Sequence, residues 1–94
     1  MDRIIRCITT DGSLMASAVE TTDIVYTAQQ IHRTSAVTTA ALGRLLSAAS
    51  LMGNMLKKKD AVVTLKIKGN GPAGAVVAIA DSTGNCRGYV ELSL

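Results

Sequence analysis

The sequence predicts an α+β fold in which a β-hairpin is followed by two helices and then by three further strands. Three observations predict it. Aliphatic residues recur at helical spacing over residues 35–57, residues 61–68 alternate strictly between apolar and polar, and glycine-rich turns separate the later apolar runs. The sequence ends inside a predicted strand, so we expect the incomplete core of a larger domain, with the second helix long and buried.

The composition is aliphatic and mildly basic. Hydrophobic residues make up 48% of the 94 positions but aromatic residues only 2%, so the core must be built from aliphatic side chains. The two cysteines and the one histidine show no Cys-x-x-Cys or His-x-x-x-His spacing, so no metal site is expected in this chain. The N-terminus lacks the apolar segment of a signal peptide, and we expect a cytoplasmic protein with free thiols.

The hairpin is predicted from two β-type segments around a turn signal. Residues 2–10 form the first strand and about 13–21 the second, joined by Asp11-Gly12 as a two-residue turn with positive φ at both positions. Apolar residues occur on both faces of these strands, which predicts a sheet covered on both sides. Cys7 is then expected to be a small buried hydrophobe.

A first helix is expected to open at Thr21-Thr22-Asp23, with a threonine hydroxyl as its cap and Asp23 at the positive end of its dipole. Its apolar stripe is Ile24, Ala28 and Ile31. His32 falls in the last turn, where a cation is favoured. No second ligand or nucleophile stands beside His32, so a structural role is favoured over a proton shuttle or a metal ligand.

The long helix is predicted over residues 35–57, with Ser35 as its N-cap and Lys57–Lys59 at the negative end of its dipole. Gly43 and Gly53 are expected to face closely packed partners, because glycine inside a helix costs about 1 kcal/mol. The expected apolar stripe is Leu42, Leu45, Leu46, Ala49, Met52 and Leu56.

A membrane span is the rival interpretation of the same segment, since it has the length that a span needs. Arg44 lies near its middle and Asn54 near its end. A central arginine is expensive in lipid. We therefore expect the core helix of a soluble domain and no membrane partner.

Three strands are expected after the long helix, at residues 61–68, 75–80 and 86–92. In the first, Val63, Leu65 and Ile67 should face inward. Residues 69–74 match the G-x-G-x-x-G dinucleotide fingerprint, but a short β-type run follows where the fingerprint needs a helix. A glycine-rich connection between strands is therefore favoured over nucleotide binding.

A set of short motifs runs along the chain: Thr21-Thr22-Asp23 with Val25, Ala28, His32 and Thr34, then Ala41-Leu42-Gly43-Arg44, Met52, Leu56-Lys57, Gly69-Asn70-Gly71-Pro72-Ala73-Gly74, Gly84-Asn85 and Arg87-Gly88-Tyr89-Val90. Taken together, these motifs resemble the thirty-three-kilodalton redox-regulated heat-shock chaperone family of bacteria. The resemblance extends over essentially all 94 residues and rests on the order and spacing of the motifs. The sequence departs from the family at Ala36, where proline is usual, and at Cys86, where an aliphatic residue is more common.

The resemblance implies a cytoplasmic, ATP-independent holdase that binds unfolding proteins under oxidative stress and forms homodimers when full-length and oxidised. Residues 1–94 would be the N-terminal part of its core domain. The family's redox switch is a C-terminal zinc site with four cysteines, and neither Cys7 nor Cys86 matches it. Zinc is therefore expected only in a C-terminal domain that this chain does not contain.

The residues themselves favour binding over catalysis, because no acid–base pair or activated nucleophile is recognisable, and we name no catalytic, cofactor or metal residue. Met15, Met52 and Met55 are candidates for adaptable contacts with clients, although core packing is favoured for each. The alternative function is a small basic nucleic-acid-binding module, based on Lys57–Lys59, Lys66 and Lys68. The sequence has no Phe or Trp to stack on bases, so nucleic acid is not expected as a partner.

Overall fold

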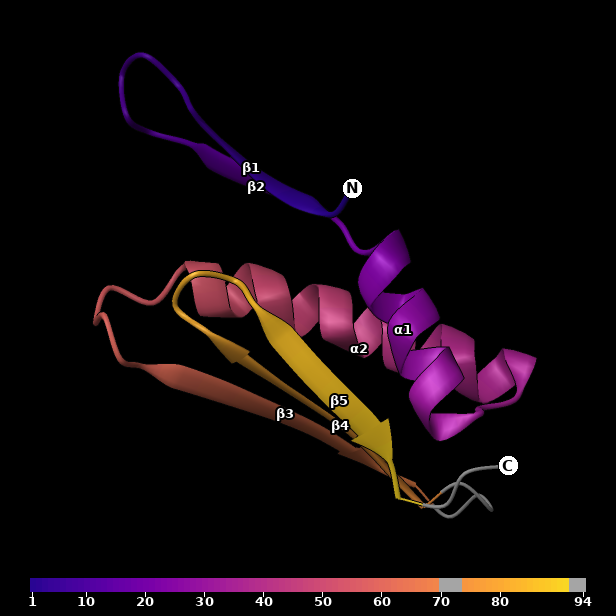
Figure 1. Ribbon diagram of the computed structural model, residues 1–94. Helices are drawn as coiled ribbons and strands as arrows, with labels where there is room; N and C mark the ends of the chain where they lie inside the picture. The colour runs from indigo at the N-terminus through magenta and orange to yellow at the C-terminus, as the bar shows by residue number, and fades with distance from the viewer. Residues whose placement is uncertain (70–73, 92–94) are drawn as a thin grey trace.

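The order of elements is the predicted one. The computed structural model describes residues 1–69 and 74–91. The two antiparallel sheets are β1–β2 and β3–β4–β5, with β4 at the centre of the second (Figure 1). The α+β arrangement of a hairpin, two helices and three further strands is therefore confirmed. The elements are β1 Arg3–Ile8, β2 Met15–Glu20, α1 Thr22–His32, α2 Ala36–Asn54, β3 Val62–Lys68, β4 Ala75–Asp81 and β5 Cys86–Val90.

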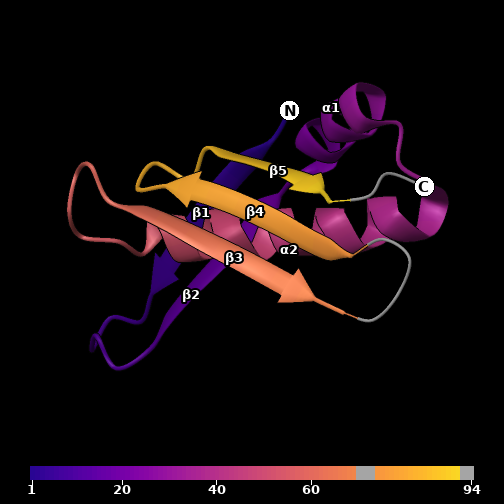
Figure 2. The same cartoon turned by 90° about the horizontal axis from the view of Figure 1, so that it is seen from below.

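The core lies between α2 and one face of the three-stranded sheet. Figure 2 shows α2 running behind the three strands, and its most deeply buried large side chains are Leu42 and Leu46. The residues of β4 that face them include Ala78 and Ala80, which are also fully covered. Small side chains on the central strand let the helix approach closely, and the helix in turn excludes water from β4.

α2 begins as predicted and ends earlier than predicted. The Ser35 hydroxyl accepts a hydrogen bond from the Thr38 amide, so Ser35 is the N-cap. The helix stops at Asn54, so Lys57–Lys59 lie beyond it and do not cap its last turn. The expected place of Met52 in the buried stripe is also wrong, since 46% of its surface is exposed. Met52 follows the stripe in sequence, but at this end of the helix the sheet leaves that side open.

Among the described helices, α2 is the one long and apolar enough to cross a membrane by length and composition. The core helix of a soluble protein has the same length and composition, and 44% of the relevant window is buried inside the protein. The packing of α2 against β4 and β5 agrees with the core-helix interpretation.

The cap of α1 differs from the prediction. Thr21 makes no capping bond, and its hydroxyl instead lies 2.8 Å from the Ser47 hydroxyl of α2. The carboxylate of Asp2 accepts from the amides of Asp23 and Ile24, at 2.9 and 2.7 Å. A carboxylate at this position satisfies two orphan N–H groups and complements the helix dipole. The hairpin thus supplies the cap of the following helix.

Removing this cap is expected to destabilise the protein. Asp2→Ala should lower the free energy of unfolding by about 1 to 1.5 kcal/mol, because two amide donors of α1 lose their acceptor. Thr22→Ala is the matched control, and it should change the value by less than about 0.5 kcal/mol. Urea denaturation followed by circular dichroism measures both. Equal effects of the two substitutions would contradict the assignment of Asp2 as the cap.

The hairpin turn is longer than the predicted two-residue turn. The strands end at Ile8 and resume at Met15, and the Thr9 amide still donates to the Leu14 carbonyl at 2.9 Å. Gly12 has a positive φ of 74°, but Asp11 does not. The Asp11 carboxylate accepts from the amide and hydroxyl of Ser13, at 3.0 and 2.8 Å, and from the Thr9 hydroxyl at 2.7 Å. Such side-chain bonds compete with a tight turn and widen it.

The same hydrogen bonds lower the pKa of the Asp11 carboxyl group. Hydrogen bonds from the Ser13 amide, and then from the hydroxyls of Thr9 and Ser13, lower the pKa of Asp11 from 3.8 to about 2. Because the folded-state pKa is the lower one, the contribution of Asp11 to stability is present above about pH 4 and is lost as the pH falls through about 2. Titration of the Asp11 carboxyl by NMR should show a midpoint near pH 2. In Ser13→Ala the midpoint should rise, and an unchanged midpoint would contradict this explanation.

The later strands follow the predicted pattern in most positions. Cys86, Gly88 and Val90 face α2, as expected, but Ile67 is largely exposed at the end of β3. Lys68 pairs with Ala75, so β3 and β4 form an antiparallel pair around the glycine-rich segment, and a strand follows it. The connection between strands is thereby confirmed, while residues 70–73 of the fingerprint lie outside the described part of the chain.

Candidate binding surface

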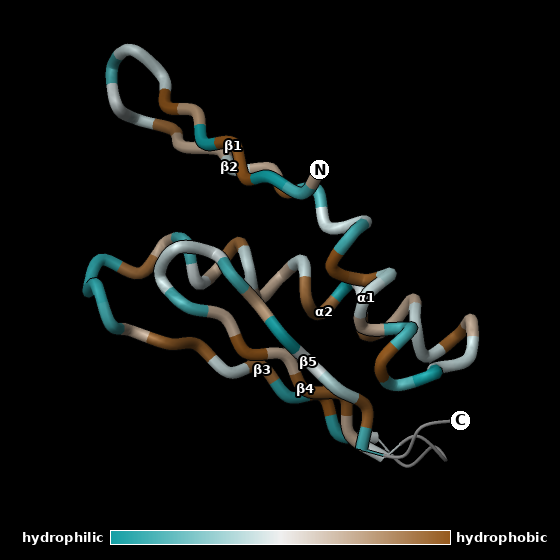
Figure 3. The backbone as a smooth tube through the Cα atoms, viewed as in Figure 1, coloured by the Kyte–Doolittle hydropathy of each residue, from teal (hydrophilic) through white to brown (hydrophobic). Residues whose placement is uncertain are grey.

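The β1–β2 hairpin carries an unusual amount of exposed apolar surface. Ile8 and Leu14, near its tip, are 68% and 69% exposed, and Ile5 and Met15 are about half exposed. Figure 3 shows brown, hydrophobic stretches along the β1–β2 hairpin, which extends away from the rest of the chain as an arm. The predicted covering of both faces is wrong, because only the base of the hairpin meets α2 and the sheet. A two-stranded hairpin with an open apolar surface is typical of a segment that contacts another protein.

The base of the hairpin is fixed by specific contacts. The Ile4 side chain packs directly on Gly84, in the turn between β4 and β5, where a Cβ atom would collide with it. That turn is held in place by the Asp81 carboxylate, which accepts bonds from the amides of Thr83 and Asn85. The Ser50 hydroxyl of α2 donates to the Gly84 carbonyl at 2.6 Å. The hairpin therefore leaves the body of the protein at a defined angle.

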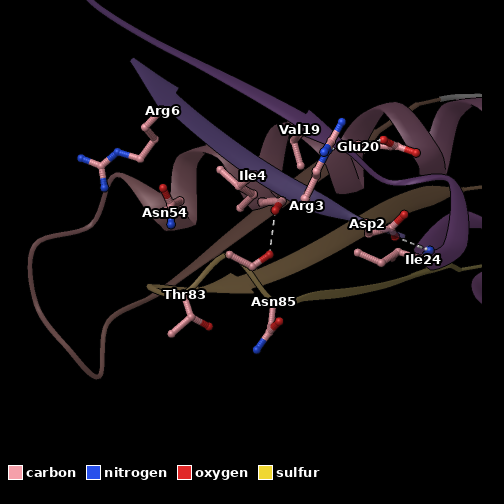
Figure 4. Close-up of a pocket in the computed structure, with 12 residues that line it drawn as sticks. Asp2, Arg3, Ile4, Arg6, Val19, Glu20, Ile24, Asn54, Thr83 and Asn85 are labelled. Atoms are coloured by element: carbon pink, nitrogen blue, oxygen red, sulfur yellow. Dashed lines mark hydrogen bonds and ion pairs between the residues drawn. The ribbon is translucent and has the colours of Figure 1, made fainter. Parts of the chain in front are cut away.

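A cleft of about 500 Å³ lies between the hairpin, the end of α2 and this turn (Figure 4). Arg6 of β1 and Asn54 at the end of α2 are among the residues that line it, and the Asn54 Oδ1 atom is buried without a hydrogen bond among the described residues. The cleft combines charged, amide and aliphatic groups and holds no cysteine or histidine. It brings together no pair of groups that would serve as general acid and base.

The two cysteines differ from each other in environment. Cys7 is exposed on the outer face of β1, so its prediction as a buried hydrophobe is wrong. The pleat turns it away from the face on which Ile4 packs against Gly84, and its own face is exposed among the described residues. Cys86, the first residue of β5, is partly buried at the cleft between this strand and α1, as expected of a covered thiol. Burial raises the pKa of Cys86, and the negative charges of Asp2 and Asp81 raise it further, which favours the protonated thiol over the thiolate.

The metal-ligating side chains lie apart from one another in the part of the chain that the structure describes. Across residues 1–69 and 74–91 there is no cluster of three His, Cys, Asp or Glu side chains that could hold a metal ion. His32 lies half-buried in the last turn of α1, in agreement with a structural position. The zinc that the resemblance implies for a separate C-terminal domain stays a prediction.

The basic residues are spread over two places. Lys57–Lys59 follow α2 in an exposed connection, while Lys66 and Lys68 lie on the face of β3 that points away from the helices. The nucleic-acid-binding module remains a prediction, and the arrangement does not gather all five lysines on one surface.

Comparison with known proteins identifies the family. The model of the Hsp33 protein family matches residues 2–93, which is nearly the whole chain. The chain belongs to the Hsp33 family. The predicted resemblance to the thirty-three-kilodalton chaperone family is therefore confirmed.

Curated Hsp33 relatives align with almost all of this chain, but the chain aligns with only part of them. The 33 kDa chaperonin of Acetivibrio thermocellus is 45% identical over 90 residues, covering 96% of this chain and 30% of the relative. The 33 kDa chaperonin of Alkaliphilus metalliredigens is 47% identical over 88 residues, covering 94% of this chain and 30% of the relative. The 33 kDa chaperonin of Bacillus licheniformis is 44% identical over 91 residues, covering 97% of this chain and 31% of the relative. The chain thus spans about a third of the length of these relatives.

Two features of this Hsp33 surface were missed by the sequence analysis. The three methionines were expected in the core, but Met15, Met52 and Met55 are all substantially exposed. The capping role of Asp2 was missed because the amide that donates to its carboxylate, that of Asp23, lies 21 residues further along the chain. The apolar residues on both faces of the hairpin strands pointed to burial, and no local signal in the sequence distinguished a covered hairpin from an exposed one.

Proposed function

We propose that this chain is part of the client-binding and dimerisation core of a redox-regulated chaperone, which holds unfolding proteins without ATP in the cytoplasm. Two observations support the proposal: the membership in the Hsp33 family, and the exposed apolar arm formed by β1 and β2. The relatives are named chaperonins, and an apolar surface on a rigid base suits the transient capture of apolar segments.

The remaining parts of the proposal come from the family resemblance. Oxidation would act on a C-terminal domain with four zinc-binding cysteines, and homodimers would form in the full-length oxidised state. Cys7 and Cys86 take no part in that switch. The function proposed for residues 1–94 is binding and not catalysis, because the described side chains offer contact surface and no reacting pair.

The proposal is tested by light scattering from thermally unfolding ovalbumin mixed with the protein that contains this chain, after oxidation with peroxide and after reduction. The oxidised protein should suppress aggregation more strongly than the reduced one. Ile8→Glu with Leu14→Glu should weaken the suppression at least fivefold, because charge disfavours apolar contact at the tip of the arm.

Thr10→Glu is the matched control, since it adds a charge to the same turn without removing apolar surface. Suppression should be unchanged in this variant. If the oxidised protein does not suppress aggregation at all, the proposed function is wrong. If the control and the double variant behave alike, the hairpin is not the contact surface.

A further inference from the structure

The turn at the tip of the hairpin contains the one place in the sequence where glycine follows aspartate, at Asp11-Gly12. In such a pair the glycine nitrogen can attack the carboxyl carbon of the aspartate side chain, because glycine has no side chain to obstruct the approach. A C–N bond forms, and the hydroxyl group of the protonated carboxyl leaves with the amide proton as water. The product is a five-membered succinimide ring.

Water then opens this ring at one of its two carbonyl carbons. Attack at the side-chain carbon restores aspartate. Attack at the main-chain carbon breaks the original peptide bond, so the chain now continues through the side chain of residue 11 and the former main-chain carbonyl becomes a free carboxylate. This product is isoaspartate, and the reaction requires only water.

The attacking nitrogen is held by the turn. The Gly12 amide donates to the Thr9 carbonyl at 2.9 Å. The nitrogen must lose this proton before it can attack, and the hydrogen bond keeps the proton in place and fixes the plane of the peptide group. The backbone thus restrains the nucleophile of the reaction.

The carboxyl group is held as well. The Asp11 Oδ1 atom accepts from the Thr9 hydroxyl at 2.7 Å, and from the hydroxyl and the amide of Ser13 at 2.8 and 3.0 Å. These three donors direct the carboxylate toward Thr9 and Ser13, and rotation of its carbon toward the Gly12 nitrogen would break them.

The same donors disfavour the reactive form of the side chain. The Ser13 amide, and then the hydroxyls of Thr9 and Ser13, lower the pKa of Asp11 from 3.8 to about 2. The protonated carboxyl, which is the form that can lose water, is therefore more than tenfold rarer at neutral pH than in an unrestrained aspartate.

We propose that Asp11-Gly12 is a latent isomerisation site, which the closed turn keeps as ordinary aspartate and which converts to isoaspartate when the turn opens. The bonds that protect it lie within residues 9–13, so the protection does not depend on what the rest of the protein places over the arm. Local opening of a turn needs less free energy than global unfolding, so heat opens this site first. The site is independent of the proposed function.

Isomerisation would alter the end of the hairpin. It adds one methylene group to the main chain between β1 and β2, and the length of the loop sets the register of a hairpin. The Thr9 amide donates to the Leu14 carbonyl at 2.9 Å, and the Leu14 amide donates to the Thr9 hydroxyl at 3.1 Å. Both hydrogen bonds span the turn, so a longer main chain would disrupt them.

The test compares the protein that contains this chain with a free peptide of residues 6–17, both kept at neutral pH and physiological temperature. Trypsin releases residues 7–33, and electron-transfer fragmentation measures isoaspartate at position 11. Isoaspartate should form at least tenfold more slowly in the protein than in the peptide, and equal rates would overturn the proposal. Asn70-Gly71 can form a succinimide by loss of ammonia, but it lies in another tryptic fragment and outside the described residues.

A double variant tests whether these hydrogen bonds are the cause. Thr9→Val with Ser13→Ala removes the two hydroxyl donors and leaves the Ser13 amide, so isoaspartate should form at least fivefold faster than in the unchanged protein. Ser17→Ala in β2 is the matched control, because Ser17 pairs with Arg6 away from the turn, and its rate should be unchanged.

Slow isomerisation in both the unchanged protein and the double variant would overturn the proposal, since something other than these bonds would then protect the site. Circular dichroism shows whether the double variant folds. If it does not fold, the comparison of the unchanged protein with the free peptide decides the matter.

Discussion

Replacing Leu46 with alanine is expected to remove about 3 to 4 kcal/mol of the free energy of unfolding, which is a large share of the total for a domain of this size. Leu46 has no exposed surface and packs in the cluster formed by α2, β4 and β5. Its neighbours include Ala49, Ala78 and Ala80, whose side chains are too short to fill the cavity that the substitution leaves. The loss should therefore exceed the lower end of the range for leucine truncation.

Urea denaturation monitored by circular dichroism gives this value directly. Met52→Ala on the same helix is the control, because Met52 is 46% exposed and its loss should cost no more than about 0.5 kcal/mol. A loss below about 1 kcal/mol for Leu46→Ala would mean that the interior between α2 and the sheet is loosely packed.

The core was predictable because its signals are periodic and local. Leu42, Leu45, Leu46 and Ala49 recur at the helical repeat and are all buried as expected. The strands β3, β4 and β5 were likewise placed correctly, since alternation and turn glycines report on the pleat and its ends. These features depend on residues within one or two turns of each other.

The errors arise where burial depends on what lies opposite an element. Periodicity shows that Ile31 and Met52 belong to apolar stripes, but not how far the covering sheet reaches, and the sheet stops short of both. Cys7 was placed in the interior for the same reason, since an apolar face was assumed to be a covered face. In this protein the exposed apolar residues of the hairpin are the candidates for binding, so the misassigned Cys7 lies on the element that carries the proposed functional surface.

The contacts that position the hairpin are also long-range. The Asp2 carboxylate accepts hydrogen bonds from the amides of α1, and Ile4 packs on Gly84, which lies near the other end of the sequence. Such pairs leave no trace in local propensity, whereas Ser35 caps its own helix and was recognisable. A single sequence therefore predicts the scaffold well and the attachment of the hairpin poorly.

Gly53→Ala is expected to lower the free energy of unfolding by about 2 kcal/mol, although alanine normally stabilises a helix relative to glycine by about 1 kcal/mol. A Cβ at position 53 would collide with the Asp81 carbonyl and lie 2.9 Å from the Ala80 Cβ. Neither group can rotate away, since one is backbone and the other is a single methyl. The end of α2 would have to move off β4.

Gly43→Ala is the matched control within the same helix. There the added Cβ would meet the two methyl groups of Val25 at 3.1 and 3.2 Å, and a small shift of α1 relieves the contact. The gain in helix propensity should roughly balance that shift, so the free energy of unfolding should change by less than about 1 kcal/mol. Urea denaturation of both variants decides the point. If Gly53→Ala is as stable as Gly43→Ala, then α2 does not rest on β4 as closely as described, and the small residues of that strand need another explanation.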